Sequence, residues 1–178
     1  MTVTNVSQKK PDLILEQYFL GKTFASGIFE DRFGNVRRQF TVDIDGTWDG
    51  KTLTLIEDFI FGDGETETRV WSIEKIAPAS YVGTADDVIG SAKGIVSGNT
   101  LNWKYDMRLK VGGSRVKVHF DDWMFLQPNG VLINKATVSK LGLDIGRVTI
   151  AFTKKADADF LSTISSTNKK PIAATLAR

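Results

Sequence analysis

Two acidic residues lie in runs of alternating apolar and polar residues, on the face that the alternation assigns to the interior of the protein. Glu57 belongs to the run at 51–61, and Asp122 belongs to the run at 115–126. Burial raises the pKa of a carboxyl group and allows it to act as a general acid or base near neutral pH. Glu57 and Asp122 are therefore the candidate catalytic residues.

Arg69 is a candidate ligand-binding residue. The turn signal GDGE at 62–65 predicts a hairpin in which Arg69 lies opposite Glu57 on the interior face. A buried guanidinium can bind a ligand carboxylate or phosphate, alone or together with a neighbouring carboxylate that orients it. The favoured alternative is a cross-strand ion pair that only fixes the register of the two strands.

Asp122 lies among aromatic residues in the clearest hairpin of the chain. This hairpin joins 100–110 to 115–126 through VGGS, and its register pairs Trp103 with Asp122 and Tyr105 with Phe120. Asp122 is then either a proton carrier or an acceptor for a Trp or Tyr donor or for backbone at a bulge. The acceptor is the favoured interpretation, because buried polar groups are usually hydrogen-bonded.

The turn signal PNG at 128–130 decides which residues of the next strand share a face with Asp122. A type I turn with a bulged Gly130 places Asn134 and Ala136 there, whereas a two-residue turn places Ile133 and Lys135 there. In the second register Lys135 would neutralise the aspartate. The sequence leaves the register of the 115–139 hairpin open.

Two further patterns contain charged residues next to turns. DRFG at 31–34 could place Arg32 at the mouth of a barrel as an anion contact, although an ion pair between Asp31 and Arg32 is favoured at such a hairpin end. TADDVIG supplies Asp86 and Asp87, whose side chains diverge in an extended segment. We interpret both as turn or cap residues.

Residue counts and motifs argue against metal and cofactor sites. The chain has no cysteine and one histidine, His119, which falls on the opposite face from Asp122. These counts exclude disulfides, thiolate metal sites and multi-histidine metal sites within one chain. DIDGTWDG has Trp48 where a calcium loop requires glycine, and no phosphate-binding loop, dinucleotide fingerprint or GxSxG motif occurs. We expect neither a metal nor a cofactor.

The elements that position these residues are short strands separated by turn signals. Alternation in 36–45 and 145–154 is typical of an antiparallel sheet with one solvated face. The expected strands are 23–31, 36–45, 51–61, 66–76, 80–85, 92–97, 100–110, 115–126, 131–139 and 145–154. The pattern predicts an all-β, antiparallel up-and-down barrel of about ten strands.

The predicted barrel occupies residues 23–154. An N-terminal segment, 1–22, precedes it with a short helix at 11–20, and residues 155–178 lose the alternation and form a C-terminal tail. A helix at this position could cover one end of a barrel.

Composition limits the class of protein. The 178 residues suit one domain, and 23 Lys and Arg against 21 Asp and Glu give no indication of nucleic-acid binding by bulk charge. No signal peptide and no transmembrane segment is recognisable in the sequence. We therefore expect a cytoplasmic protein, and the oligomeric state stays open.

Four strings occur in the order GxFxDRxG, DGxxxxRxW, GNxLxWxY and FDDW, within roughly residues 19–154. Together they resemble an uncharacterised bacterial family of small lipoproteins of unknown function. The resemblance implies a lipocalin-like, calycin-type barrel and no known activity. Typical members carry a lipid-attachment cysteine after a signal peptide, which this sequence lacks, so membrane anchoring is not expected here.

Three hypotheses of function follow. The leading one is binding of a small hydrophobic or lipid-like acidic molecule inside the barrel, with Arg69 or Arg32 meeting the acidic group. The other candidate ligand-binding residues are Trp71, Trp103, Tyr105, Phe120, Met124 and Asn134. The second hypothesis is a cofactor-free isomerase, cyclase or lyase that uses Asp122 or Glu57. The third is a structural or protein-interaction barrel with a filled interior. The sequence does not decide whether the protein is an enzyme.

Overall fold

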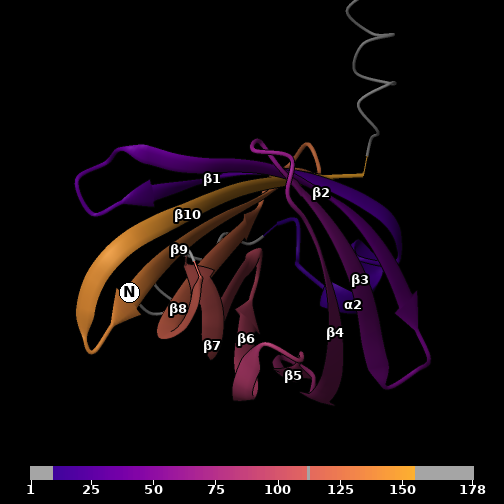
Figure 1. Ribbon diagram of the computed structural model, residues 1–178. Coiled ribbons are helices and arrows are strands. Elements are labelled where there is room, and N and C mark those ends of the chain that lie inside the picture. The colour runs from indigo at the N-terminus through magenta and orange to yellow at the C-terminus, as the bar shows by residue number, and fades with distance from the viewer. Residues whose placement is uncertain (1–9, 112, 155–178) are drawn as a thin grey trace, which may run out of the picture.

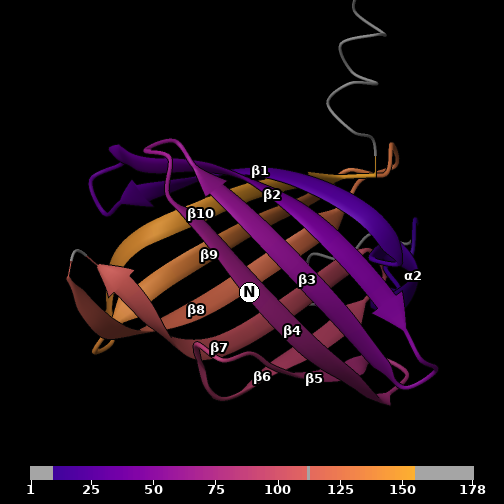
Figure 2. The ribbon, with the colours of Figure 1, turned by 45° about the vertical axis from the view of Figure 1, so that its right-hand side comes forward.

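Ten antiparallel strands form a closed barrel in the computed structural model, which describes residues 10–111 and 113–154 (Figures 1 and 2). Each strand pairs with its neighbours in the chain, and β1 pairs with β10 to close the barrel. The strands are β1 Gly21–Asp31, β2 Val36–Trp48, β3 Thr52–Phe61, β4 Thr66–Ala77, β5 Ser80–Thr84, β6 Val88–Ser97, β7 Thr100–Val111, β8 Ser114–Leu126, β9 Leu132–Lys140 and β10 Leu143–Thr153. The predicted all-β up-and-down barrel is confirmed. The predicted tail at 155–178 lies outside the described residues.

The predicted strands differ from the observed ones mainly at β6. Its first residue is Val88 instead of the predicted residue 92, because Val88 and Ile89 already pair with β7 before the register shifts between Ile89 and Lys93. Gly90 has a φ of +70° inside this irregular segment. A residue with positive φ interrupts the alternation from which the strand was predicted.

The hairpin registers follow the alternation of the sequence. Glu57 pairs with Arg69 across β3 and β4, and Trp103 pairs with Asp122 across β7 and β8, as predicted. Between β8 and β9, Asp122 pairs with Ala136. At the turn, the Gly130 N–H donates to the Gln127 carbonyl at 3.0 Å, and Gly130 has a φ of +84°. The register with the bulged glycine is therefore the correct one of the two.

A single helical turn closes one end of the barrel. The helix α2 spans Leu15–Tyr18, shorter than the predicted 11–20, because the Leu13 N–H donates to the Gly98 carbonyl and Ile14 is extended. Leu15 and Phe19 are buried at this end. Figure 2 shows α2 against the ends of the strands. The described part of the chain contains no helix with the length and apolar character needed to span a bilayer.

The helix is also held by polar contacts. Glu16 accepts hydrogen bonds from Lys75 and from the Tyr81 hydroxyl, and the Tyr18 hydroxyl donates to the Gly130 carbonyl at 3.0 Å. The Phe19 carbonyl packs against Gly46, where an added Cβ would lie 1.7 Å from that oxygen. Only glycine therefore fits under the helix at this position.

The barrel wall is shortest at β5, which spans only Ser80–Thr84. The ladder between β4 and β5 ends at Ser72 and Thr84, so the segment of β4 from Thr66 to Trp71 extends past the end of β5. The turn after β5 contains Asp87, whose carbonyl accepts a hydrogen bond from the Arg108 N–H of β7 at 2.8 Å. Asp87 thus lies in a seam between β4 and β7.

Candidate functional site

The interior of the barrel contains a cavity of about 680 Å³. Nine of the ten predicted site residues line it, and Leu15 and Phe19 form its floor at the closed end. The nine are Glu57, Arg69, Trp71, Trp103, Tyr105, Phe120, Asp122, Met124 and Asn134. Most of the other lining side chains are aliphatic or aromatic. The filled interior expected of a purely structural barrel is not found.

Aromatic rings form a continuous wall of the cavity. Trp71 contacts Trp103 and Tyr105 edge-on at centroid distances of 5.7 and 5.4 Å, and Tyr105 lies parallel to Phe120 at 5.1 Å. Such contacts between aromatic rings stabilise packing beyond the burial of their area. The wall is therefore a fixed surface against which a flat or extended apolar molecule can pack.

Two glycines make room for Trp103. A Cβ at Gly94 would lie 2.3 Å from Trp103 Cε3, and a Cβ at Gly83 would lie 2.6 Å from Trp103 Cζ2. Both distances are far below van der Waals contact, so the indole occupies space that any larger residue on β5 or β6 would take. The two glycines thus determine how close this aromatic wall lies to the barrel backbone.

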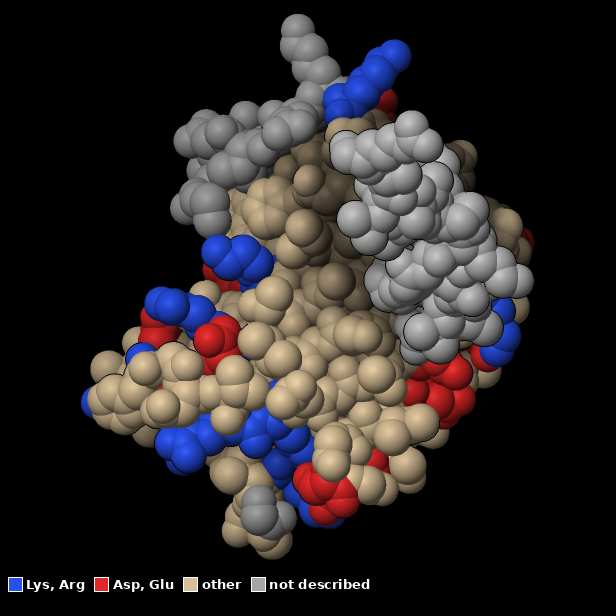
Figure 3. All heavy atoms as spheres, turned by 90° about the horizontal axis from the view of Figure 1, so that it is seen from above, with Lys and Arg blue, Asp and Glu red and all other residues tan. Residues whose placement is uncertain are grey.

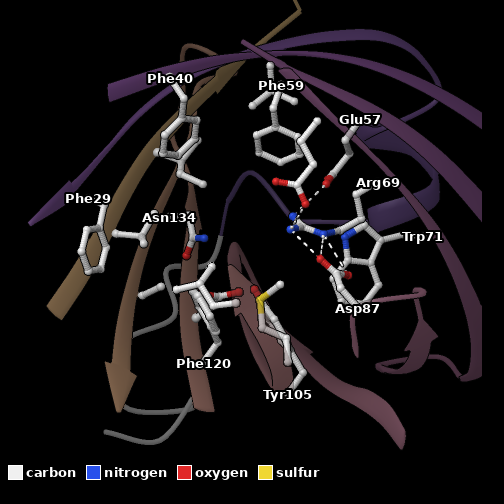
Figure 4. A pocket seen from close by; sticks show the side chains of 18 of the residues that line it. Phe29, Phe40, Glu57, Phe59, Arg69, Trp71, Asp87, Tyr105, Phe120 and Asn134 are labelled. Carbon is white, nitrogen blue, oxygen red and sulfur yellow. Dashed lines mark hydrogen bonds and ion pairs between the residues drawn. The ribbon is translucent and has the colours of Figure 1, made fainter. Parts of the chain in front are cut away.

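Arg69 is bound by Asp87 more closely than by its predicted partner, Glu57. Its Nε and Nη2 atoms lie 2.9 and 2.8 Å from Asp87 Oδ2, whereas Nη1 lies 3.7 Å from Glu57 Oε2. Glu67 lies at 3.7 Å from Nη2. Figure 4 shows Glu57, Arg69 and Asp87 gathered on one side of the cavity. The predicted cross-strand contact exists, but two of the three guanidinium nitrogens point at Asp87.

The charges of this cluster are perturbed by burial. Burial raises the pKa of Glu57 to about 7, because the opposing attraction of Arg69 is smaller and Asp87 adds repulsion. Burial lowers the pKa of Arg69, but Glu57 and Asp87 outweigh it and raise that pKa overall. Arg69 is therefore always charged, while Glu57 exchanges its proton near neutral pH.

Asp122 is a second buried carboxyl group, with 4% of its surface exposed. Burial raises the pKa of Asp122 to about 7, although hydrogen bonding with Asn134 and Tyr105 lowers it. Among the described residues, Asp122 Oδ1 and Asn134 Oδ1 are buried oxygens without a hydrogen-bond partner. In Figure 4, Asn134 lies across the cavity from the Arg69 cluster.

Sequence reasoning missed the inward orientation of Asp87. The residue lies in a turn, as predicted, but its carboxylate points to the interior and is only 15% exposed. Two features of the sequence could have indicated this orientation. The strand before Asp87 is short, and the inward-facing Arg69 has more hydrogen-bond donors than Glu57 alone can accept.

Arg32 lies outside the cavity lining. It is exposed and stacks over Phe33 at 4.8 Å from the ring centroid. The expected ion pair between Asp31 and Arg32 is wrong, because Asp31 pairs with Arg37 across the β1–β2 turn. Strand pairing brings the side chain of Arg37, two residues after Asn35, back over the aspartate.

Positive charges border the open end of the cavity. Arg108, Lys110 and Arg115 belong to the β7–β8 hairpin, are exposed and have no carboxylate within 4 Å among the described residues. Elsewhere the charges are mixed, and Figure 3 shows Lys and Arg lying beside Asp and Glu around a broad uncharged area. The described residues contain no group of three or more His, Asp or Glu side chains that could hold a metal ion.

A family model described as "protein of unknown function (DUF3833)" matches residues 1–154. The chain belongs to the DUF3833 family. This agrees with the resemblance to an uncharacterised family seen in the sequence. No curated protein matches this DUF3833 chain in sequence.

A solved structure similar to this DUF3833 barrel is that of the S-type phycobiliprotein lyase from Guillardia theta. The TM-score is 0.58, the sequence identity is 6%, and the match covers 79% of this chain and 90% of the lyase chain. At this identity the similarity shows a shared barrel fold and nothing more.

Proposed function

We propose that this DUF3833 protein binds a small hydrophobic molecule inside its barrel. The observation that carries the proposal is the cavity of about 680 Å³ with its largely apolar and aromatic lining. Ligand pockets are typically about 300–1,000 Å³ with a few polar groups among apolar ones, and this cavity has both properties. The similarity in fold to a phycobiliprotein lyase is compatible with a barrel that handles a small molecule.

An acidic group on the ligand is expected at the open end of the barrel instead of at Arg69. The guanidinium of Arg69 is already bound by Asp87 at 2.8 Å. The carboxyl groups of Glu57 and Asp122 line the same cavity. A further anion there would be repelled. Arg108, Lys110 and Arg115 of the β7–β8 hairpin, which pair with no carboxylate of residues 10–111 and 113–154, offer the more favourable contact for it.

The first test is native mass spectrometry and lipid extraction of protein purified from its own host. A retained apolar molecule of defined mass is the expected result. The second test fills the cavity with Ala136→Trp, since Ala136 is buried in the lining beside Asp122. The matched control is Lys135→Trp, because Lys135 is exposed on the outside of the same strand. Retention by the Ala136 variant and the control alike would contradict the proposal.

The second candidate function is cofactor-free acid–base catalysis in the same cavity. It is favoured by one observation, namely that the pKa values of both Glu57 and Asp122 are raised to about 7. A group that titrates near the working pH is suited to transfer protons in either direction. Asp122→Asn is expected to abolish turnover of the extracted molecule while leaving its affinity nearly unchanged. Equal loss of turnover and affinity would leave binding as the function.

A further inference from the structure

Two buried oxygens near the closed end of the cavity have no hydrogen-bond donor within the described part of the chain. Asp122 Oδ1 belongs to β8 and Asn134 Oδ1 to β9, and the two residues are 4% and 3% exposed. Asn134 lies two residues from Leu132, where β9 begins at the closed end. Both residues line the cavity, so the unpartnered groups belong to its wall.

When Asp122 is ionised, these two oxygens cannot satisfy each other. An amide carbonyl and an ionised carboxylate both only accept hydrogen bonds. Tyr105 and Asn134 hydrogen-bond with the carboxyl group of Asp122, but its Oδ1 atom is still without a partner. The guanidinium of Arg69 is held by Asp87 on the other side of the cavity (Figure 4). A buried acceptor without a donor weakens a protein, and a ligand that supplies the donor removes this penalty.

We infer that Asp122 and Asn134 recognise a hydrogen-bond donor, such as a hydroxyl or amide N–H, at the inner end of a long hydrophobic ligand. The inference rests on the proposed function and narrows its ligand class. The ligand enters with this donor first, because the donor's partners lie near the floor formed by Leu15 and Phe19. An acidic group at its other end meets the cations of the β7–β8 hairpin.

The length of the ligand follows from the strand between the two ends. Arg115 at the mouth and Asp122 in the interior are seven residues apart on β8. At about 3.3 Å per residue this is about 23 Å of strand, or about 18 Å of barrel height at the usual tilt of about 40°. A chain of sixteen carbons is the matching probe length.

The test compares hexadecanoate with its 16-hydroxy and 16-methoxy derivatives at pH 8. The 16-hydroxy probe offers a terminal donor, and the 16-methoxy probe has the same oxygen without one. Affinities are measured by displacement of the neutral dye N-phenyl-1-naphthylamine. The 16-hydroxy probe is expected to bind roughly tenfold more tightly than the other two, as one added hydrogen bond to a buried charged acceptor predicts.

Variants locate the preference. The double variant Asp122→Leu/Asn134→Leu is expected to remove the preference for the hydroxy probe. The control Lys135→Leu, on the outside of β9 beside Asn134, is expected to keep it. Equal affinity of the hydroxy and methoxy probes for the wild-type protein would overturn this inference while hydrophobic binding stands, and that comparison needs no variant. Absence of binding by the dye and all three probes would overturn the proposed function, and this inference with it.

Discussion

Asp122→Asn should remove a large part of the pH dependence of stability. The pKa of Asp122 is about 7 in the folded protein and 3.8 for an ordinary aspartate. Between these values the folded state holds a proton that the unfolded chain releases, so the free energy of unfolding falls as pH rises. The stabilisation is fully present below pH 3.8 and is lost as pH rises through about 7. An asparagine at this position does not titrate, so the Asp122→Asn variant lacks this pH-dependent contribution to stability.

The size of the effect follows from the pH range between the unfolded and folded pKa values of Asp122. Each pH unit in which one proton separates the two states changes the free energy of unfolding by about 1.4 kcal/mol. Between pH 5 and pH 7 the contribution of Asp122 therefore falls by about 2 kcal/mol, because the last pH unit already lies within its titration. The stability of Asp122→Asn relative to the wild type should rise by this amount over the same interval. The new amide has an acceptor in Asn134, whose side chain already hydrogen-bonds with Asp122 and whose Oδ1 is without a partner.

Urea unfolding of the two proteins at pH 5, 6, 7 and 8, without ligand, measures this difference. The control is Asp121→Asn, because Asp121 is the neighbouring residue on β8, faces away from the cavity and pairs with Lys104. The control should keep the wild-type pH dependence. Parallel pH profiles for the wild type and Asp122→Asn would refute the reasoning, since Asp122 would then be ionised in the folded barrel over this range.

Three further predictions concern the same interior. Glu57→Gln should flatten the pH dependence of unfolding between pH 5 and 7 in addition to the Asp122 effect, because its pKa of about 7 is also raised by burial; an unchanged profile would contradict this. Arg69→Met should cost about 3 kcal/mol in urea unfolding at pH 8, because the half-buried Asp87 loses its partner, and a loss below about 1 kcal/mol would count against it. Gly94→Ala should cost about 1–3 kcal/mol and change the tryptophan fluorescence, because its methyl displaces an indole ring, whereas Gly113→Ala, with open space around it, should do neither.

Much of the fold was predictable because it depends on local alternation. In a strand successive side chains point to opposite faces. The run at 100–110 therefore places Trp103 and Tyr105 on its apolar face, which turns inward, and this does not depend on how the other strands are arranged. The same rule placed Glu57 and Arg69 opposite each other. The register at PNG was not predictable in this way, because both turns suit the sequence and only the positive φ of Gly130 decides between them.

The sequence by itself determined which face of each strand turns inward, and with it nine of the ten predicted residues of the cavity wall. Only the tertiary structure decided that Asp87 reaches Arg69, that Asp31 pairs with Arg37, and that the enclosed space stays open. The physical reason is that inward orientation on a strand follows from a period of two residues along the chain. The partners of turn residues and the volume left inside depend on how long each strand is and where the barrel closes.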